Sequence, residues 1–374
     1  MRFINCLIYD KNFQLQRRDL VCQDGKIVDL PLPNRPSSDG QEHEIEDLNG
    51  GIICPGFLDI HIHGAMEADT MDADFDGLNR ISRYLAARGI TGFLPTTMTV
   101  AVEDIQRAFN QATDVSGAQV LGFNMEGPFI SAKKRGAHVE RFVRPPRLEE
   151  FELYKPERGI RVVTVAPEIE GALDFIEAIA DRTVVSLGHT TADYDTSMAA
   201  IERGARSLTH TFNAMPPLLH RDPGLIAAAV KSGIHGEIIA DTVHVHPAVI
   251  YCAWKLFGSD RLILISDSMR AAGLEDGDFE LGGQHVEVKN GVARADNGAI
   301  AGGTSNVWAC VGHAIDAGIP VPDALKMASQ NPAQLIGLGD SKGSIAPGYD
   351  ADFLVLRGVH EIDRVYIGGQ LFEA

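Results

Sequence analysis

The sequence predicts an α/β protein, a (β/α)8 barrel of the TIM type with a small β-sandwich domain formed from both termini. The middle of the chain alternates short β-branched runs with amphipathic stretches of helical spacing, which is typical of repeated β-α units around a parallel sheet. Both ends of the chain contain short strand-like runs instead. The length of 374 residues exceeds the roughly 250 residues of a barrel, so a second, smaller domain is expected.

The barrel prediction depends on the number of strand-like runs between Gly56 and about Gly339. Eight runs are found, at 57–63, 92–97, 120–125, 161–166, 183–187, 207–211, 237–240 and 262–266. Helix-like segments separate them at 75–88, 102–113, 194–203 and 225–231. Several of these segments end at a glycine, as helices commonly do (Gly89, Gly204, Gly233).

The two ends of the chain complete the domain organisation. Strand-like runs occur at 2–9, 20–22, 26–30 and 45–48, and again at 351–356, 363–367 and 370–372. The simplest arrangement places 1–53 and 341–374 in one β-domain and 54–340 in the barrel. The segment 271–303, rich in Gly and Asp, is too long for a plain βα loop, and we expect it to form a hairpin near the barrel mouth.

Composition restricts the partners and the compartment. A formal net charge of −18 argues against nucleic acid or an anionic membrane as a partner, because both favour a basic surface. The N-terminus carries charges at Asp10 and Lys11, and no apolar run is long enough to cross a membrane, so we expect a cytoplasmic protein. The five cysteines are scattered without CxxC spacing, and we expect buried, reduced thiols.

The sharpest local signal is a pair of histidines in Asp59-Ile60-His61-Ile62-His63, at the end of the first predicted strand. Side chains alternate along a strand, so His61 and His63 lie on the same face. In a barrel of this type, that end of the strands forms the mouth where active sites are built.

Other polar residues interrupt apolar runs at the same ends of other strands. Glu126 ends the third strand, His189 ends the fifth, His210 lies on the sixth and Asp267 ends the eighth. Buried charges and imidazoles are costly unless they are paired or bind a metal, and one shared metal explains all of them. Imidazole and carboxylate ligands without thiolates favour zinc, with iron(II) as the alternative.

Longer motifs resemble known families. Two segments resemble motifs of the amidohydrolase superfamily: 55–59 (Pro-Gly-Phe-Leu-Asp), which leads into the first barrel strand, and 347–353 (Pro-Gly-Tyr-Asp-Ala-Asp-Phe), which leads back into the β-domain. Within it, the N-acetylglucosamine-6-phosphate deacetylase family is similar along essentially the whole chain, at 126–129, 136–138, 187–190, 210–216, 240–245 and around Asp267. The Asn-Ala-Met-Pro element at 213–216 is the most specific part.

This resemblance implies a role for each candidate residue in hydrolysis of the acetamide of a phosphorylated N-acetyl amino sugar. Asp267 is implied as the catalytic acid and base. Glu126, His189 and His210 are implied as ligands of the principal metal, and His61 and His63 as ligands of a second ion whose occupancy stays open. The residues implied to contact the substrate are His138 near the acetyl carbonyl, Ala137, Asn213, Ala214, Ile300, His244 near the phosphate, and Arg221, reaching the phosphate from the other subunit of a homodimer.

Several alternatives remain open on the sequence. One alternative is a sugar of the galacto rather than the gluco configuration, since epimer choice depends on one hydroxyl contact that the sequence does not locate. A cyclic amidase or aminoacylase uses the same scaffold, although the Asn-Ala-Met-Pro element argues against both. A catalytically silent binding barrel is the alternative outside enzymes, and the complete ligand set argues against it. Lys133, Lys134 and Arg135 resemble a phosphate patch, but such a cluster is more often the solvated face of a loop.

Overall fold

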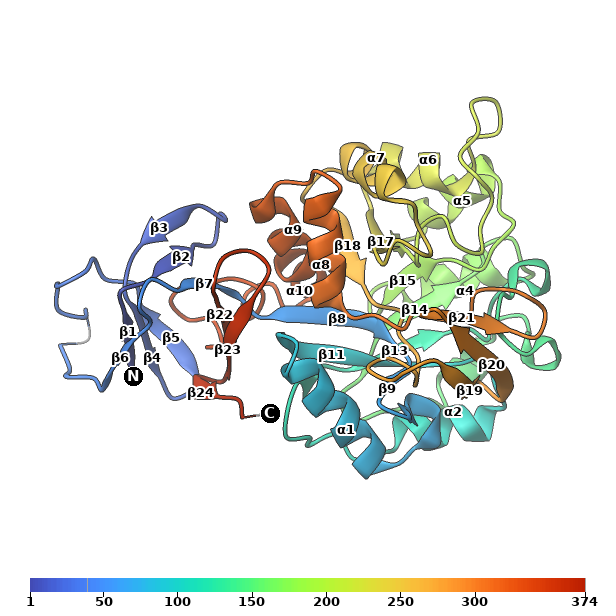
Figure 1. Cartoon of the computed structure of the whole chain (residues 1–374). Helices are drawn as coiled ribbons and strands as arrows, with labels where there is room; N and C mark the ends of the chain where they lie inside the picture. The colour runs from blue at the N-terminus through green and yellow to red at the C-terminus, as the bar shows by residue number, and fades with distance from the viewer. Residues whose placement is uncertain (39, 374) are drawn as a thin grey trace.

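The computed structural model describes residues 1–38 and 40–373, and shows a β-rich part beside a barrel surrounded by helices (Figure 1). The β-rich part has two sheets. One has the order β5-β4-β1-β6 (Lys26–Asp29, Leu20–Gln23, Arg2–Ile4, Ile45–Asp47). The other has the order β24-β23-β22-β7-β2-β3 (Gln370–Leu371, Ile362–Ile367, Phe353–Leu356, Ile52–Pro55, Leu7–Tyr9, Leu15–Arg17).

Both termini contribute to this sandwich. Strand β22 from the C-terminal end pairs antiparallel with β7 from the N-terminal end. Between the sheets, the ring of Phe3 on β1 lies 5.1 Å from that of Phe353 and 4.9 Å from that of Tyr366. These buried rings form the core of the sandwich. The predicted fold is confirmed, while the boundaries 53/54 and 340/341 stay a prediction.

The run 2–9, which we predicted as one strand, is two strands in different sheets. The backbone of Asn5 has a φ of 54°, in the left-handed region that Asn tolerates better than most residues. The chain therefore turns at Asn5 and passes from the sheet of β1 to the sheet of β2. Alternation of apolar residues does not reveal such a turn.

The barrel consists of parallel strands in the order β8, β11, β13, β14, β15, β16, β17, β18 (Phe57–Ile62, Ile90–Thr97, Phe123–Glu126, Ile160–Val165, Val184–Leu187, Ala205–Leu208, His235–Ile239, Leu262–Ile265). A short strand β12 (Gln119–Val120) also pairs with β11, so the predicted strand 120–125 is interrupted, with Gly122 at a φ of 137°. The N–H of Asp267 donates to the carbonyl of His61 over 2.9 Å, which links the last strand to the first.

Helices lie outside the strands, as in a barrel whose connections cross its outer face (Figure 1). The helices are α1 to α10 (Phe75–Ala86, Val102–Phe109, Leu148–Phe151, Ala172–Ile179, Tyr194–Glu202, Gly224–Ser232, Pro247–Phe257, Val307–Asp316, Val321–Ala328, Gln330–Leu335). Aspartate caps begin two of them: Asp74 accepts from the N–H of Gly77, and Asp193 from that of Thr196. Short 3-10 turns occur at Thr70–Asp72, Ala132–Lys134 and Glu140–Phe142.

The segment 271–303 is not a simple hairpin. It contains a three-stranded antiparallel sheet of β19, β20 and β21 (Gly277–Leu281, Gln284–Lys289, Val292–Ala295). The side chain of Gln284 donates to the carbonyl of Ala137, so this sheet is attached to the loop after β13. A second small pair, β9 and β10 (Gly64–Ala65, Ala68–Asp69), follows β8. Both lie at the end of the barrel where the strands finish.

A buried lysine joins the β-rich part to the barrel. Lys342 Nζ lies 2.6 Å from Asp352 Oδ2 and donates to the side chain of Gln119 over 3.0 Å. Among the five cysteines, Cys252 is exposed, which corrects the expectation that all are buried. No helix in the described part of the chain is long and apolar enough to cross a membrane.

Candidate active site

Three of the predicted site residues lie two positions after the ends of barrel strands and have unusual backbone conformations. His189, His210 and Asp267 have φ values of 46°, 29° and 47°. Left-handed backbone at residues other than glycine costs on the order of 1–3 kcal/mol and persists where the surrounding structure imposes it, commonly at functional sites. His210 was predicted on a strand, but β16 ends at Leu208. With this backbone, Nε2 of His210 lies 3.0 Å from Oε1 of Glu126.

Glu126, at the end of β13, is the centre of the cluster. Its Oε1 lies 3.1 Å from Nε2 of His189, 3.0 Å from Nε2 of His210 and 3.4 Å from Nε2 of His61. Its Oε2 lies 3.1 Å from Nε2 of His63. Residues from three other strands, β8, β15 and β16, therefore converge on one buried carboxylate.

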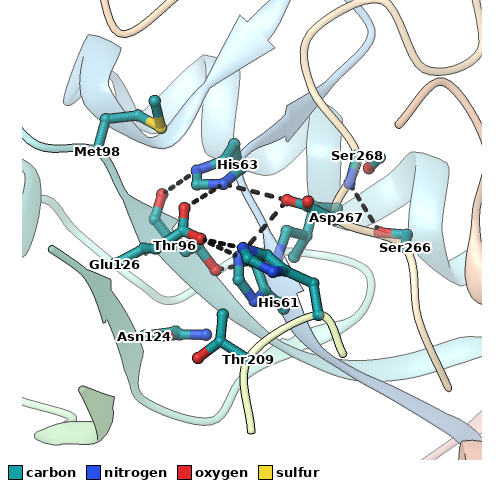
Figure 2. Close-up of polar contacts among 12 residues, drawn as sticks. His61, His63, Thr96, Met98, Asn124, Glu126, Thr209, Ser266, Asp267 and Ser268 are labelled. Atoms are coloured by element: carbon teal, nitrogen blue, oxygen red, sulfur yellow. Dashed lines mark hydrogen bonds and ion pairs between the residues drawn. The ribbon is translucent and has the colours of Figure 1, made fainter. Parts of the chain in front are cut away.

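Asp267 faces the histidine pair from the last strand. Its Oδ1 lies 3.3 Å from Nε2 of His63 and 3.5 Å from Nε2 of His61 (Figure 2). The ligand atoms of His61, His63 and Asp267 all lie within 4.8 Å of one another, and so do those of Glu126, His138 and His189. The mouth of the barrel thus holds two adjacent groups of possible metal ligands.

Hydrogen bonds to the second ring nitrogens show which histidines present a lone pair to this centre. Nδ1 of His189 lies 2.8 Å from the carbonyl of Lys134, and Nδ1 of His63 lies 3.3 Å from the carbonyl of Thr96. A carbonyl only accepts, so both Nδ1 atoms donate. The neutral rings then carry lone pairs on Nε2, as metal-binding histidines do.

His138 has the opposite tautomer. The N–H of Thr99 donates to its Nδ1 over 3.2 Å, so the ring proton of the neutral imidazole is on Nε2. That Nε2 lies 3.3 Å from Oε2 of Glu126. His138 is therefore placed as a hydrogen-bond donor beside the cluster, although distance alone groups it with the possible ligands.

The electrostatics of the cluster favour a cation. Burial alone would raise the pKa of Asp267, but the imidazoles of His61 and His63 lower that pKa to about 2. Burial opposes charge on His63 too, yet Asp267 and Glu126 raise the pKa of His63 to about 9. Burial lowers the pKa of His189 to about 4, which keeps its lone pair free at neutral pH. The negative potential that stabilises protons here also attracts a divalent ion.

The donor atoms fit a metal ion. Nε2 of His189 and Nε2 of His210 are 2.9 Å apart, and Glu126 Oε1 lies at a similar distance from both. Donor atoms with this spacing can all lie about 2 Å from one ion, the usual distance for zinc with nitrogen or oxygen ligands. Nε2 of His61 is buried and has no hydrogen-bond partner among the described residues. Bound metal is a natural partner for such an atom.

A cavity of about 370 Å³ opens above this cluster. Most of the predicted substrate contacts line it: Ala137, His138, Asn213, Ala214, His244 and Ile300. Nδ1 of His244 lies 2.7 Å from Oδ2 of Asp241, which fixes the ring. Lys133 and Lys134 also line the cavity, which supports the phosphate-patch interpretation for these two residues.

Two predicted site residues do not line the cavity. His61 is fully buried beneath it. Arg221 lies in an exposed loop and contacts His220. This loop between β16 and α6, yellow-green in Figure 1, projects from the rest of the molecule. The structure of one chain therefore does not bring Arg221 to its own site.

Sequence reasoning missed several residues of the site. Met98 and Leu281 line the cavity, but isolated apolar residues carry no recognisable signal. Glu237 is fully buried on β17, and its Oε2 lies 3.1 Å from Nδ1 of His61. The rule applied to the strand ends, that a charge inside an apolar strand needs a partner, would have identified Glu237 within the run His-Gly-Glu-Ile-Ile.

A barrel with histidines and carboxylates that can hold a metal at the ends of its strands is typical of metal-dependent hydrolases of the amidohydrolase class. The chain belongs to the amidohydrolase family, whose model matches residues 52–372. The N-acetylglucosamine-6-phosphate deacetylase of Bacillus subtilis (strain 168) is 38% identical over 354 residues, covering 91% of this chain and 88% of that protein. The N-acetylgalactosamine-6-phosphate deacetylase of Escherichia coli O157:H7 is 34% identical, covering 96% and 98%.

Solved structures of deacetylases are also similar to this chain. The N-acetyl-D-glucosamine-6-phosphate deacetylase of Mycobacterium smegmatis, a mutant in complex with N-acetyl-D-glucosamine-6-phosphate, matches with a TM-score of 0.92 at 31% identity, covering 99% of this chain and 98% of that one. The deacetylase of Thermotoga maritima matches with a TM-score of 0.89 at 31% identity, covering both chains fully. The similarity includes the β-rich part as well as the barrel.

Proposed function

We propose that this protein hydrolyses the acetamide of N-acetylglucosamine-6-phosphate to acetate and glucosamine-6-phosphate. The observation that carries the proposal is the placement of Asp267 and His138 beside the Glu126 cluster, where both line a cavity that two lysines also line. Relatives that match nearly the whole chain are deacetylases of such sugars. One structural relative was solved in complex with N-acetyl-D-glucosamine-6-phosphate.

Glu126, His189 and His210 hold the principal ion in this proposal, and His61 and His63 provide a second position. A divalent ion supplies Lewis acidity, since it lowers the pKa of water and stabilises negative charge on a carbonyl oxygen. Zinc fits the donor set best, with iron as the alternative. One or two ions per chain are compatible with these ligands.

The chain's own groups move the protons. Asp267, ionised because His61 and His63 lower its pKa, accepts a proton from water as the water attacks the acetyl carbon. His138 donates through Nε2–H to the oxygen that becomes negative. Asp267 then returns the proton to the amide nitrogen, so that the C–N bond breaks and the amine leaves.

The phosphate end is recognised away from the reacting bond. Lys133, Lys134 and His244 line the same cavity and can pair with a phosphate. Contacts from Ala137, Asn213, Ala214 and Ile300 orient the sugar. Binding energy from this remote group then holds the amide over the reacting groups, so the unphosphorylated sugar reacts poorly.

A homodimer completes the proposed site. Arg221 does not line the cavity of its own chain, and Leu218 and Leu219 beside it are exposed at 41% and 50%. Exposed leucines on a projecting loop fit a contact with a second copy. Arg221 would then reach the phosphate of the partner subunit's site.

The proposed location is the cytoplasm. The described cysteines are free thiols, as is usual for proteins of that compartment.

The second candidate function is deacetylation of N-acetylgalactosamine-6-phosphate, because one relative at 34% identity carries that name. Acetate release from both phosphorylated epimers and from unphosphorylated N-acetylglucosamine by the zinc-loaded protein tests the proposal. Faster release from the gluco phosphate supports it. Release from the galacto epimer alone changes only the substrate, whereas metal-loaded protein that releases acetate from none of them contradicts the deacetylase function.

A further inference from the structure

Glu237 is a buried carboxylate that the proposed reaction does not use. It lies on β17 with no exposed surface. Its Oε2 lies 3.1 Å from Nδ1 of His61 and accepts a hydrogen bond from the main-chain N–H of His210 over 3.2 Å. One carboxylate oxygen therefore contacts residues of both proposed metal positions.

The partner of His61 differs from the partners of the other rings. Nδ1 of His63 and Nδ1 of His189 donate to neutral main-chain carbonyls, whereas Nδ1 of His61 donates to a carboxylate. A carboxylate acceptor fixes the tautomer of a metal-binding histidine and makes its other nitrogen more basic. Nε2 of His61 therefore gains both an orientation and a stronger lone pair. That atom is buried without a hydrogen-bond partner in the described part of the chain.

The charge of Glu237 has few local partners. Among the described residues its one ion pair is with His61. Glu126 and Asp267 likewise form their described ion pairs with histidines only. When the imidazoles are neutral, as metal binding requires, a single divalent ion balances two of these three carboxylates. Because a buried charge is costly when it is not balanced, the third carboxylate fits a second divalent ion.

We propose that Glu237 is a positioning residue which, acting through His61, enables His61, His63 and Asp267 to hold a second divalent ion. This inference rests on the proposed function only in treating the site as a metal centre. The identity of the substrate does not enter it. Glu237 itself touches neither substrate nor metal.

The variant Glu237→Gln tests the charge without changing the shape. A glutamine oxygen can replace Oε2 and keep both hydrogen bonds, and the amide nitrogen then replaces Oε1, which has no partner among the described residues. Full-length protein is stripped of metal and titrated with Zn²⁺ or Co²⁺ against a competing chelator. We expect two ions per wild-type chain. In the variant, we expect one ion at unchanged affinity and a second bound roughly 10- to 100-fold more weakly.

Two comparisons distinguish an effect of Glu237 that acts through His61 from a general effect of removing a buried negative charge. In a His61→Asn background, Glu237→Gln should cause no further change in ion number or affinity. Asp59→Asn removes another buried carboxylate of the barrel, one that accepts hydrogen bonds from Ser266 and contacts only the main chain of His61. All titrations are made at pH 8, above the pKa of about 7 to which burial raises Asp59, so that this control also removes a charge. It should keep both ions.

The inference is overturned if wild-type protein binds one ion only, or if Glu237→Gln binds two with wild-type affinity. It is also overturned if Asp59→Asn weakens the second ion as much as Glu237→Gln does. Thermal unfolding of each variant shows whether the fold is retained, and normal binding of the first ion is an internal check. Protein that binds two ions but releases no acetate contradicts the proposed function while leaving this inference intact.

Discussion

The main-chain N–H of Thr99 donates to Nδ1 of His138 over 3.2 Å, and this one bond decides what His138 does. The ring proton of the neutral imidazole must be on Nε2, at the edge of the Glu126 cluster. His63 and His189 donate through Nδ1 and present a lone pair instead. Two kinds of histidine therefore surround the same carboxylate, and only one kind suits metal binding.

The variant His138→Ala should therefore lose turnover and keep metal. Removing one donor to a developing oxyanion typically lowers kcat about 10²- to 10³-fold. We expect a loss of that size for acetate release, with the metal content of the purified protein unchanged. Loss of an ion together with activity would identify His138 as a ligand and contradict the tautomer assigned from Thr99.

The variant Asp267→Asn removes the proposed acid and base while preserving its size. General acid–base groups contribute roughly 10²- to 10⁴-fold, so kcat should fall at least that far. Glu126, His189 and His210 remain, and the principal ion should stay bound. Kinetics and metal analysis on the same preparation check both statements. Near-normal turnover would exclude the proposed role of Asp267.

The order of the strands and most of the candidate site could be predicted because each depends on local sequence. Eight apolar runs ending in polar residues such as Glu126 and Asp267 indicate a barrel with a polar mouth, whatever the details of packing. The turn at Asn5 and the backbone at His210 could not be predicted, since their positive φ values depend on tertiary contacts. Glu237 could have been identified as a buried charge within an apolar strand, but its partner could not, because His61 is 176 residues away.

Asp59 should make the stability of the protein depend on pH. Burial raises the pKa of Asp59 to about 7, although Ser266 and His61 donate hydrogen bonds to it. The folded state then holds this proton at pH values where the unfolded state, with a pKa of about 3.9, has released it. Its contribution to stability therefore falls as pH rises from about 4 to 7.

Replacing Asp59 with asparagine tests this pH dependence of stability. Between pH 5 and pH 8, wild-type protein should lose about 2–3 kcal/mol of unfolding free energy relative to Asp59→Asn. Denaturant unfolding of both proteins at the two pH values measures this difference. A difference that does not change with pH would show that Asp59 has the same proton occupancy in the folded and unfolded states.

Lys134 allows the phosphate subsite to be tested apart from the metal centre. Its contact with Nδ1 of His189 is made by the main-chain carbonyl, so substitution of the side chain leaves that bond in place. The ammonium group lines the cavity and donates to the carbonyl of Met215 over 3.3 Å. Lys134→Met keeps the apolar stem and removes the charge. If the charge binds phosphate, KM for the phosphorylated sugar should rise roughly tenfold, since a charge-assisted hydrogen bond contributes about 1.5–3 kcal/mol.

Two controls accompany the Lys134→Met variant. Its metal content should not change, and neither should its slow reaction with the unphosphorylated sugar. Equal effects on the two sugars would instead mean that Lys134 acts on the sugar ring or on the fold of the loop, and would leave His244 and Lys133 as the phosphate contacts of this chain.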